Sequence, residues 1–267
     1  MTAYVDAHTH LSNLTVENLQ MMKLAGVETV VSPVQLGCEG MLHTDTIIDI
    51  WHSQLTRQFR RARNALIRPY AMLGISMVAL PLDAEARLYE ELESLLGKPE
   101  VVAIGEIGFE PGSASNKDRD YQRAILLEQI RIAAKCGKLV DIHTPNAAAE
   151  KVKATEETLK LCAEAGIELS KVVFDHCSAD NLELVLESGA NAAISVQPWR
   201  KITPDMAAEW VMTRPADRIM IDSDCSELLS DPLAVAKTAV ALEKRGAESQ
   251  LIQAVCGGNA GRIYGLA

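Results

Sequence analysis

Six side chains that can bind metal ions stand far apart along the chain, most of them at the ends of short apolar runs. They are four histidines and two carboxylates: His8, His10, Glu106, His143, His176 and Asp224. Imidazole nitrogens and carboxylate oxygens are the usual ligands of zinc and of related divalent ions. Because residues two apart on a strand point to the same side, His8 and His10 could grip one ion together. Burying so many titratable groups without a metal would be costly, so the set is a candidate metal centre.

A carboxylate placed between two groups of ligands can bridge two ions. We expect Glu106 to be that bridge, with His8, His10 and Asp224 on the first ion and His143 and His176 on the second. Two divalent ions lower the pKa of a shared water toward neutrality. Asp224 is the best-placed group to take the proton of the nucleophile and return it to the leaving group. The predicted chemistry is hydrolysis, with Asp224 and Glu106 as catalytic residues.

The elements that must position these side chains alternate from end to end of the chain. Short runs rich in Val and Ile alternate with longer segments of helical periodicity, which is typical of a parallel sheet built from βαβ units. Eight units in 267 residues, without a Pro-, Gly- or Ser-rich linker, predict a single (β/α)8 TIM barrel domain over residues 1–267. A doubly wound open sheet is the alternative. The barrel is favoured because barrel enzymes assemble their sites at the carboxyl ends of the strands. The predicted strands are Tyr4–His8, Glu28–Ser32, Pro69–Ile75, Val101–Glu106, Leu139–His143, Lys171–His176, Ala190–Val196 and Arg218–Asp222.

Helices are indicated by apolar stripes and by start signals. Thr203-Pro204 and Asp231-Pro232 each place a capping side chain before a proline suited to the first helical position. We therefore expect helices to begin there, after the seventh and eighth strands. Three further segments carry one-sided helical stripes, namely Leu55, Phe59, Ala62 and Leu66; Leu127, Ile130 and Ala134; and Leu233, Lys237 and Val240.

Composition excludes several classes of protein. The chain is 48% hydrophobic and 23% charged, with a net charge of −10, which is ordinary for a globular domain and disfavours unspecific attraction to nucleic acid. Its longest uncharged run, 69–82, is too short and proline-broken to cross a membrane. The first residues show no secretory signal, so we expect a cytoplasmic protein. The six cysteines form no Cys-x-x-Cys pair and indicate no disulfide scaffold.

A set of motifs in matching order resembles the TatD-like metal-dependent hydrolases, which belong to the amidohydrolase-type barrels. The motifs are Val5-Asp6-Ala7-His8-Thr9-His10-Leu11, Gly105-Glu106-Ile107-Gly108, His143, Asp175-His176-Cys177, Asp222-Ser223-Asp224 and the terminal segment 259–266. The resemblance spans the whole chain. It implies a dinuclear site of divalent ions and hydrolysis, of DNA phosphodiesters in the best-known members. The family's metal-ligand positions are all filled, by His8, His10, Glu106, His143, His176 and Asp224.

Departures from the family pattern lie around the ligands. The nuclease members carry Gly-x-His-Pro-His after the third strand, where this chain has Gly74-Ile75-Ser76-Met77-Val78. They place an arginine soon after the fifth-strand histidine, where this chain has Thr144-Pro145-Asn146. Phe109-Glu110-Pro111 replaces Leu-Asp-Tyr, and Cys177-Ser178-Ala179-Asp180 replaces Cys-Phe-Ser-Gly. The chain thus has fewer groups that can bind phosphate, and it has additional carboxylates. We therefore predict a pocket that is less suited to a polyanion.

Substrate contacts are expected in the loop after the seventh strand. Trp199 and Arg200 stand there, on the predicted catalytic face, with Lys201 as a weaker candidate. A basic cluster lies opposite the stripe that contains Phe59, and we interpret it as a solvated helix face rather than a phosphate site. Cys177 and Cys225 adjoin ligand positions, and we expect them to point elsewhere. The basic cluster consists of Arg57, Arg60, Arg61, Arg63 and Arg68.

Several readings of the function stay open at this point. Phosphoesterases that begin with paired histidines continue with Ser-Asp-Gly, which is missing after His10. Lactonases and amidases of this barrel type commonly use a carboxylated lysine as the bridge, whereas Glu106 stands here. A small-molecule hydrolase of esters, lactones or amides and a catalytically silent metal-binding barrel are the alternatives. The cofactors would be two divalent ions, zinc or manganese before magnesium. The partner would be a small molecule or single-stranded nucleic acid, with neither a membrane nor an obligate protein partner.

Overall fold

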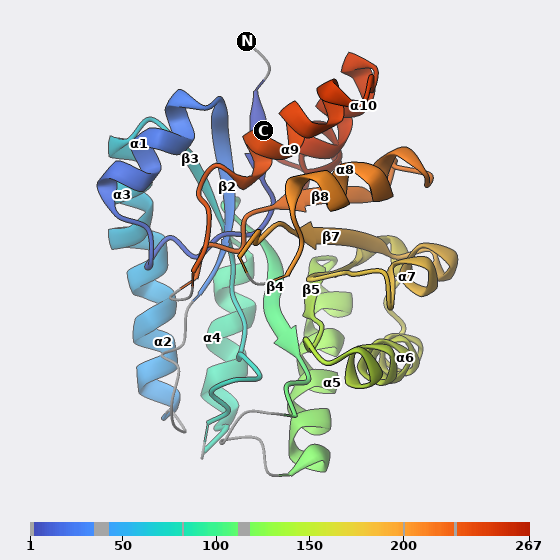
Figure 1. The fold of residues 1–267 in the computed structure, drawn as a ribbon. Helices are drawn as coiled ribbons and strands as arrows, with labels where there is room; N and C mark the ends of the chain where they lie inside the picture. Colours follow the sequence, from blue (N-terminus) through green and yellow to red (C-terminus); the bar gives the residue numbers. More distant parts are fainter. Residues whose placement is uncertain (1–2, 35–42, 82, 112–117, 200, 227–228) are drawn as a thin grey trace. The chain divides into compact units, whose positions relative to one another are not determined.

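The computed structural model describes residues 3–34, 43–81, 83–111, 118–199, 201–226 and 229–267. Within them, eight strands alternate with helices and follow one another in the sheet in chain order, β1 to β8 (Figure 1). The strand pairs are parallel. This is the (β/α)8 barrel topology, so the predicted fold class is confirmed.

The chain divides into two compact units. The first comprises Met1–Ser32, Thr56–Tyr70 and Ala192–Ala267, and the second comprises Pro33–Leu55 and Ala71–Asn191. Four elements have residues on both sides of a unit boundary, namely β2 (Val27–Pro33), η1 (Gln54–Gln58), β3 (Arg68–Met72) and β7 (Asn191–Ser195). The single domain predicted over residues 1–267 therefore stays a prediction.

The first unit holds the two ends of the chain and the segments that carry His8, His10 and Asp224. Its elements are β1 (Tyr4–Asp6), α1 (Val16–Leu24), β2 (Val27–Pro33), η1 (Gln54–Gln58), α3 (Phe59–Asn64), β3 (Arg68–Met72), β7 (Asn191–Ser195), α8 (Pro204–Met212), β8 (Ile219–Asp222), α9 (Ala234–Lys244), α10 (Ser249–Gln253), η3 (Ala254–Gly258) and α11 (Asn259–Tyr264).

Buried strands and a hydrogen-bonded carboxylate organise this unit. β1 pairs with β2, and β7 pairs with β8 over four residues. At the end of β1, Asp6 is fully buried and accepts hydrogen bonds from the backbone N–H of Ser223, at 3.0 Å, and from its hydroxyl, at 2.6 Å. Burial raises the pKa of Asp6 to about 6, although the Ser223 bonds lower it. The bonds tie the segment after β1 to the segment after β8, and each of these segments carries predicted ligands.

The second unit holds the segments that carry Glu106, His143 and His176. Its elements are α2 (Thr44–Ser53), α4 (Ala86–Leu96), β4 (Val101–Gly108), α5 (Arg119–Cys136), β5 (Leu139–His143), α6 (Ala148–Ala165), η2 (Leu169–Lys171), β6 (Val172–Phe174) and α7 (Leu182–Ser188).

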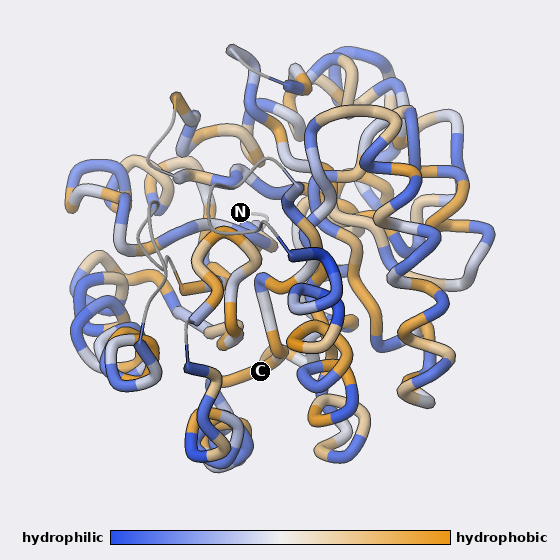
Figure 2. Tube along the Cα trace, turned by 90° about the horizontal axis from the view of Figure 1, so that it is seen from below, coloured by the Kyte–Doolittle hydropathy of each residue, from blue (hydrophilic) through white to orange (hydrophobic). Residues whose placement is uncertain are grey.

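The core of the second unit lies between its strands and the helices beside them. All eight residues of β4 are buried, as expected for a parallel strand covered on both faces. On α4, Leu88, Leu92 and Leu95 are buried while Glu90 and Glu93 lie on the other side or at its edge. Figure 2 shows the same alternation of hydrophobic and hydrophilic stretches along the helices. One-sided helices of this kind position strand ends by burying their apolar face.

Helix starts and ends follow the local chemistry of the chain. Thr203 caps α8, its hydroxyl accepts from the Met206 N–H, and Pro204 is the first helical residue, as predicted. The helix predicted to begin at Asp231-Pro232 begins a little later in the structure, at Ala234. It follows a turn in which Asp231 accepts a hydrogen bond from the N–H of Leu233.

Several details predicted from the pattern are wrong. Leu66 was expected on a buried stripe, but it lies beyond the end of α3 with φ 60° and its side chain is 74% exposed. β1 ends at Asp6 rather than at His8, and β6 ends at Phe174 rather than at His176. His8 and His176 thus belong to the segments after the strands. Among the described helices, none combines the length and apolar character needed to span a bilayer.

Candidate metal centre

In the second unit, one carboxylate oxygen meets two imidazole rings. Glu106 lies in β4, His143 is the last residue of β5, and His176 follows β6. The Oε1 atom of Glu106 is 2.5 Å from Nδ1 of His143 and 3.0 Å from Nε2 of His176. The two rings stand edge to face with their centroids 4.9 Å apart. One ligand atom from each residue lies within 4.8 Å of the others, which suits a divalent ion.

In each ring, the nitrogen that does not contact Glu106 faces another carboxylate. Nε2 of His143 is 3.0 Å from Oε2 of Glu110, and Nδ1 of His176 is 3.3 Å from Oδ2 of Asp175. A carboxylate behind a ligating histidine fixes the ring and its tautomer, and it leaves the inner nitrogen for the metal. Burial lowers the pKa of His143, but the Glu106 and Glu110 carboxylates outweigh it and raise this pKa to about 9.

A buried lysine supports the backbone at His176. Lys151 of α6 is 3% exposed, and its Nζ donates to the hydroxyl of Thr144, at 3.0 Å, and to the carbonyl oxygen of His176. The Thr144 hydroxyl donates in turn to the carbonyl of Asp175 at 2.6 Å. His176 has φ 55°, an unusual value for a residue other than glycine. These bonds hold a backbone conformation that aims the ring at Glu106.

Two glycines of the Gly105-Glu106-Ile107-Gly108 motif are required by close packing. A Cβ atom at Gly105 would lie 2.6 Å from Cβ of Asp141, and one at Gly108 would lie 2.8 Å from the carbonyl oxygen of His143. Gly108 also has φ 152°. The register of β4 against β5 shifts between Ile104 and Ile107, which gives the segment around Glu106 its own path. The motif therefore brings Glu106 close to the end of β5.

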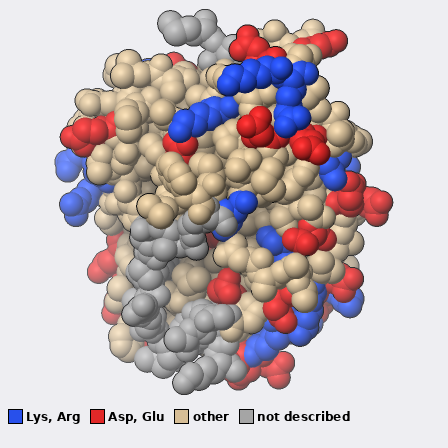
Figure 3. Space-filling view, viewed as in Figure 1, with Lys and Arg blue, Asp and Glu red and all other residues tan. Residues whose placement is uncertain are grey.

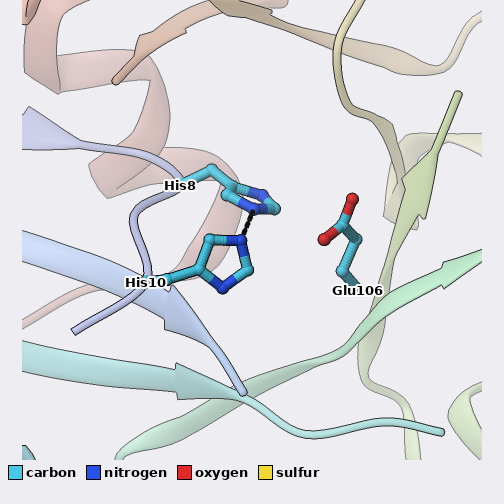
Figure 4. Close-up of side chains that lie close together, drawn as sticks. All are labelled: His8, His10 and Glu106. Carbon is cyan, nitrogen blue, oxygen red and sulfur yellow. Dashed lines mark hydrogen bonds between the residues drawn. The ribbon is translucent and has the colours of Figure 1, made fainter. Parts of the chain in front are cut away.

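In the first unit, three predicted ligands also come together. Nε2 of His8 and Nε2 of His10 are 3.4 Å apart, and the ring centroids are 5.1 Å apart. Figure 4 marks the contact between the two rings with a dashed line. Nε2 of His10 is 3.6 Å from Oδ1 of Asp224. The backbone N–H of Asp224 donates to the carbonyl of His8 at 3.0 Å, which joins the two segments. His10 thus lies next to both of the other residues, and all three side chains are of types that bind divalent ions.

The other oxygen of Asp224 is held by two residues from the segment after β7. Nε2 of Gln197 donates to Oδ2 of Asp224 at 2.8 Å and to its backbone carbonyl at 2.7 Å. Nζ of Lys201 lies 3.4 Å from the same Oδ2 atom. Asp224 has φ 40°, so its backbone needs such support. Sequence reasoning missed Gln197, whose signal is a polar amide directly after an apolar strand.

The remaining predicted residues fall into three groups. Trp199 is 61% exposed, and Arg200 lies outside the described residues. Cys177 and Cys225 are buried, and burial raises the pKa of the Cys225 thiol. In the basic cluster, Arg61 donates to the carbonyl oxygens of Leu11 and Leu14, while the other four arginines are exposed, as predicted for a solvated face.

The segments that replace the nuclease motifs carry no basic group in the described residues 74–78 and 144–146. Ser76 and Met77 are buried, and the backbone of Ile75 is bonded on both sides by the buried amide of Gln129. Thr144 is buried and bonded as described above. Asp180 is exposed and accepts from the Ser178 hydroxyl.

Comparison with known proteins identifies the relatives of the chain. The sequence profile described as TatD-related DNase matches residues 5–265. The chain belongs to this family. It is a TatD-type metal-dependent hydrolase, and its described residues supply candidate metal ligands.

Individual relatives agree with this assignment. An uncharacterized metal-dependent hydrolase of Methanocaldococcus jannaschii is 28% identical over 262 residues, which cover 98% of this chain and 100% of that protein. The crystal structure of the TatD-like protein of Archaeoglobus fulgidus has a TM-score of 0.79 at 24% identity and covers 98% of this chain and 99% of that one. A TatD homologue of Escherichia coli has a TM-score of 0.71 at 17% identity and covers 99% and 98%. These two structures share the fold of this chain.

Proposed function

We propose that this TatD-type protein uses two divalent ions to hydrolyse a phosphodiester or a related ester or amide bond. The observation that carries the proposal is the sharing of one Glu106 oxygen by ring nitrogens of His143 and His176. His8, His10 and Asp224 would hold the first ion, His143 and His176 the second, and Glu106 would bridge the two. Support for the bridge comes from the family and from the placement of all six residues close to or beyond the carboxyl ends of strands.

The donor set fits such ions. Both clusters combine imidazole nitrogens with carboxylate oxygens, and both have outer partners that orient the ligands. A set with four imidazoles favours zinc or manganese over magnesium, which prefers oxygen ligands and water.

The residues of the chain divide the work of the reaction. The two ions, when bound, would activate water and polarise the scissile carbonyl or phosphoryl oxygen. Asp224 would accept the proton of the attacking water and deliver it to the leaving group, while Gln197 holds its carboxylate in place. Glu110 would keep the Nε2 proton on His143, so that Nδ1 stays free to ligate.

A small-molecule hydrolase without nuclease activity is the second candidate function. It is favoured by the described segments 74–78 and 144–146, which have serine, methionine and threonine where the nuclease members have histidine and arginine. On the face that Figure 3 shows, the described basic side chains lie beside acidic ones rather than in a continuous basic surface. In the second unit, Arg119 and Arg123 are paired with Glu157 and Glu164. A groove for single-stranded nucleic acid relies on unpaired positive charge and on stacking.

The test is a panel of substrates with protein reconstituted with zinc or manganese. It comprises a single-stranded oligonucleotide, bis-p-nitrophenyl phosphate, a p-nitrophenyl ester and a lactone, each assayed with Asp224→Asn and with the exposed control Asp217→Asn. Cleavage of the oligonucleotide that Asp224→Asn abolishes supports the nuclease function. Turnover of the ester or lactone alone supports the second candidate. Turnover of none of the substrates, with metal bound, would leave a silent metal-binding barrel and contradict the proposal.

A further inference from the structure

Lys201 is a basic side chain whose ammonium group lies next to Asp224. Its Nζ is 3.4 Å from Oδ2 of Asp224, and its side chain is 17% exposed. Trp199, two residues earlier in the same segment, is 61% exposed. We propose that Lys201 binds a negatively charged group of the substrate, a carboxylate or a phosphate, beside the bond that is cleaved. This inference rests on the proposed function, and it names the substrate class as anionic.

Lys201 is not needed to orient Asp224. Gln197 already donates to the same oxygen at 2.8 Å and to the Asp224 carbonyl at 2.7 Å, which is closer than the lysine. A lysine that served only to hold the carboxylate would be expected at the distance of a good ion-pair hydrogen bond, about 2.7–2.9 Å. An ammonium group has three donors, and the contact with Asp224 uses one of them.

The position of Lys201 is fixed by the backbone around it. Its N–H donates to the carbonyl of Gln197 at 2.8 Å, and two residues later Thr203 caps α8 ahead of Pro204. The lysine is therefore anchored on both sides by structure that also holds Gln197. A preorganised cation of this kind loses less conformational entropy when it binds an anion.

Charge explains when the lysine would become available. Without a metal, Asp224 is the anion that Lys201 faces. A divalent ion on the other carboxylate oxygen would share that negative charge and weaken the attraction to the lysine. An ammonium group is a compact point charge, which matches a single carboxylate or phosphate. The exposed indole of Trp199 offers an apolar surface for the organic part of the same substrate.

A second lysine–aspartate pair in the same unit provides the contrast. Nζ of Lys237 is 2.5 Å from Oδ2 of Asp231, whose other oxygen accepts from the N–H of Leu233 just before α9. Because the Asp231 carboxylate stabilises a turn, Lys237 has a structural role. Lys237→Met is therefore the matched control for Lys201→Met.

The experiment measures the binding of inorganic phosphate by calorimetry to protein stripped of metal, after the chelator has been removed. Asp224→Asn should bind phosphate about three- to tenfold more tightly than the wild type, because the ammonium loses its partner. Lys201→Met in the Asp224→Asn background should abolish that gain, and Lys237→Met in the same background should keep it. Lys201→Gln serves as a second variant if Lys201→Met fails to fold.

A second readout uses the metal-loaded enzyme with matched anionic and neutral p-nitrophenyl esters. Lys201→Met should reduce kcat/KM for the anionic ester about tenfold more than it reduces kcat/KM for the neutral ester. Equal losses on both esters, or an unchanged phosphate affinity in Asp224→Asn, would overturn the assignment of Lys201. Absence of turnover on every ester would count against the proposed function, whereas the phosphate experiment tests Lys201 without any turnover.

Discussion

The two clusters of ligands use the same residue types but are held in opposite ways. In the second unit, carboxylates orient imidazoles, because Glu110 and Asp175 lie behind His143 and His176. In the first unit, an amide orients a carboxylate, because Gln197 donates to Asp224, and the ammonium of Lys201 lies beside the same oxygen. Carboxylates behind histidines strengthen them as ligands, whereas hydrogen bonds to a carboxylate draw charge away from it.

This difference indicates a division of labour between the clusters. We expect the Glu106–His143–His176 cluster to bind its ion more tightly and the His8–His10–Asp224 cluster to bind more weakly. The weaker site contains Asp224, the proposed acid and base, and it adjoins Lys201, the proposed anion contact. Tight binding of a metal ion and proton transfer would thus depend mainly on residues of different units.

The largest expected effect comes from removing the charge of Glu106. Glu106→Gln leaves a neutral amide at 2.5 Å and 3.0 Å from the two ring nitrogens. Because the proposed bridge between the ions would be lost, kcat should fall by a factor on the order of 10³ or more, with a loss of bound metal. The measurements are steady-state kinetics and elemental analysis. Glu128→Gln, at a residue of α5 whose side chain is 47% exposed, is the control; full activity of Glu106→Gln would contradict the bridge.

Replacing Lys151 should lower the free energy of unfolding. Lys151→Met removes the donor to the buried Thr144 hydroxyl and to the carbonyl of His176, and unsatisfied buried acceptors cost about 1–3 kcal/mol each. We expect the free energy of unfolding of the metal-free protein to fall by about 3 kcal/mol in urea titrations. Lys153→Met, exposed on the same helix, should change it by less than about 0.5 kcal/mol. Equal stability of the two variants would show that the buried lysine does not support His176.

A smaller effect is expected at the outer partner of His143. Glu110→Gln keeps the size of the side chain but weakens the bond that orients the ring, so metal affinity should fall about tenfold to a hundredfold. The matched control is Glu91→Gln, whose carboxylate is 3.0 Å from Nε2 of the exposed His52. Competition with a chromophoric chelator measures both. An unchanged affinity in Glu110→Gln would remove the basis for the tighter second cluster.

Much of the fold could be predicted from the sequence because strand and helix periods differ. The strand Leu139–His143 has the predicted bounds, and the Thr203-Pro204 helix start is confirmed. The exposure of Leu66 could not be foreseen, because the apolar spacing continues past the residue at which the helix ends.

The candidate ligands could be found from residue types, but their outer partners could not. Glu110 and Asp175 stand near ligands in sequence, yet the pattern does not say which nitrogen each one faces. Gln197 and Lys201 reach Asp224 from a segment more than twenty residues away, so only the folded chain reveals the contact. His8 and His10 converge although they lie beyond β1, through loop geometry rather than through the alternation of a strand.

The most direct test of the two-cluster account is the metal content of protein purified without chelator, measured per chain by elemental analysis. The account predicts about two divalent ions in the wild type and about one in each of His10→Ala and His143→Ala, with the His143→Ala variant losing the more tightly held ion. About one ion in the wild type, or loss of all metal in both variants alike, would contradict separate sites in the two clusters. No bound metal at all would contradict the central claim that these residues form a metal centre.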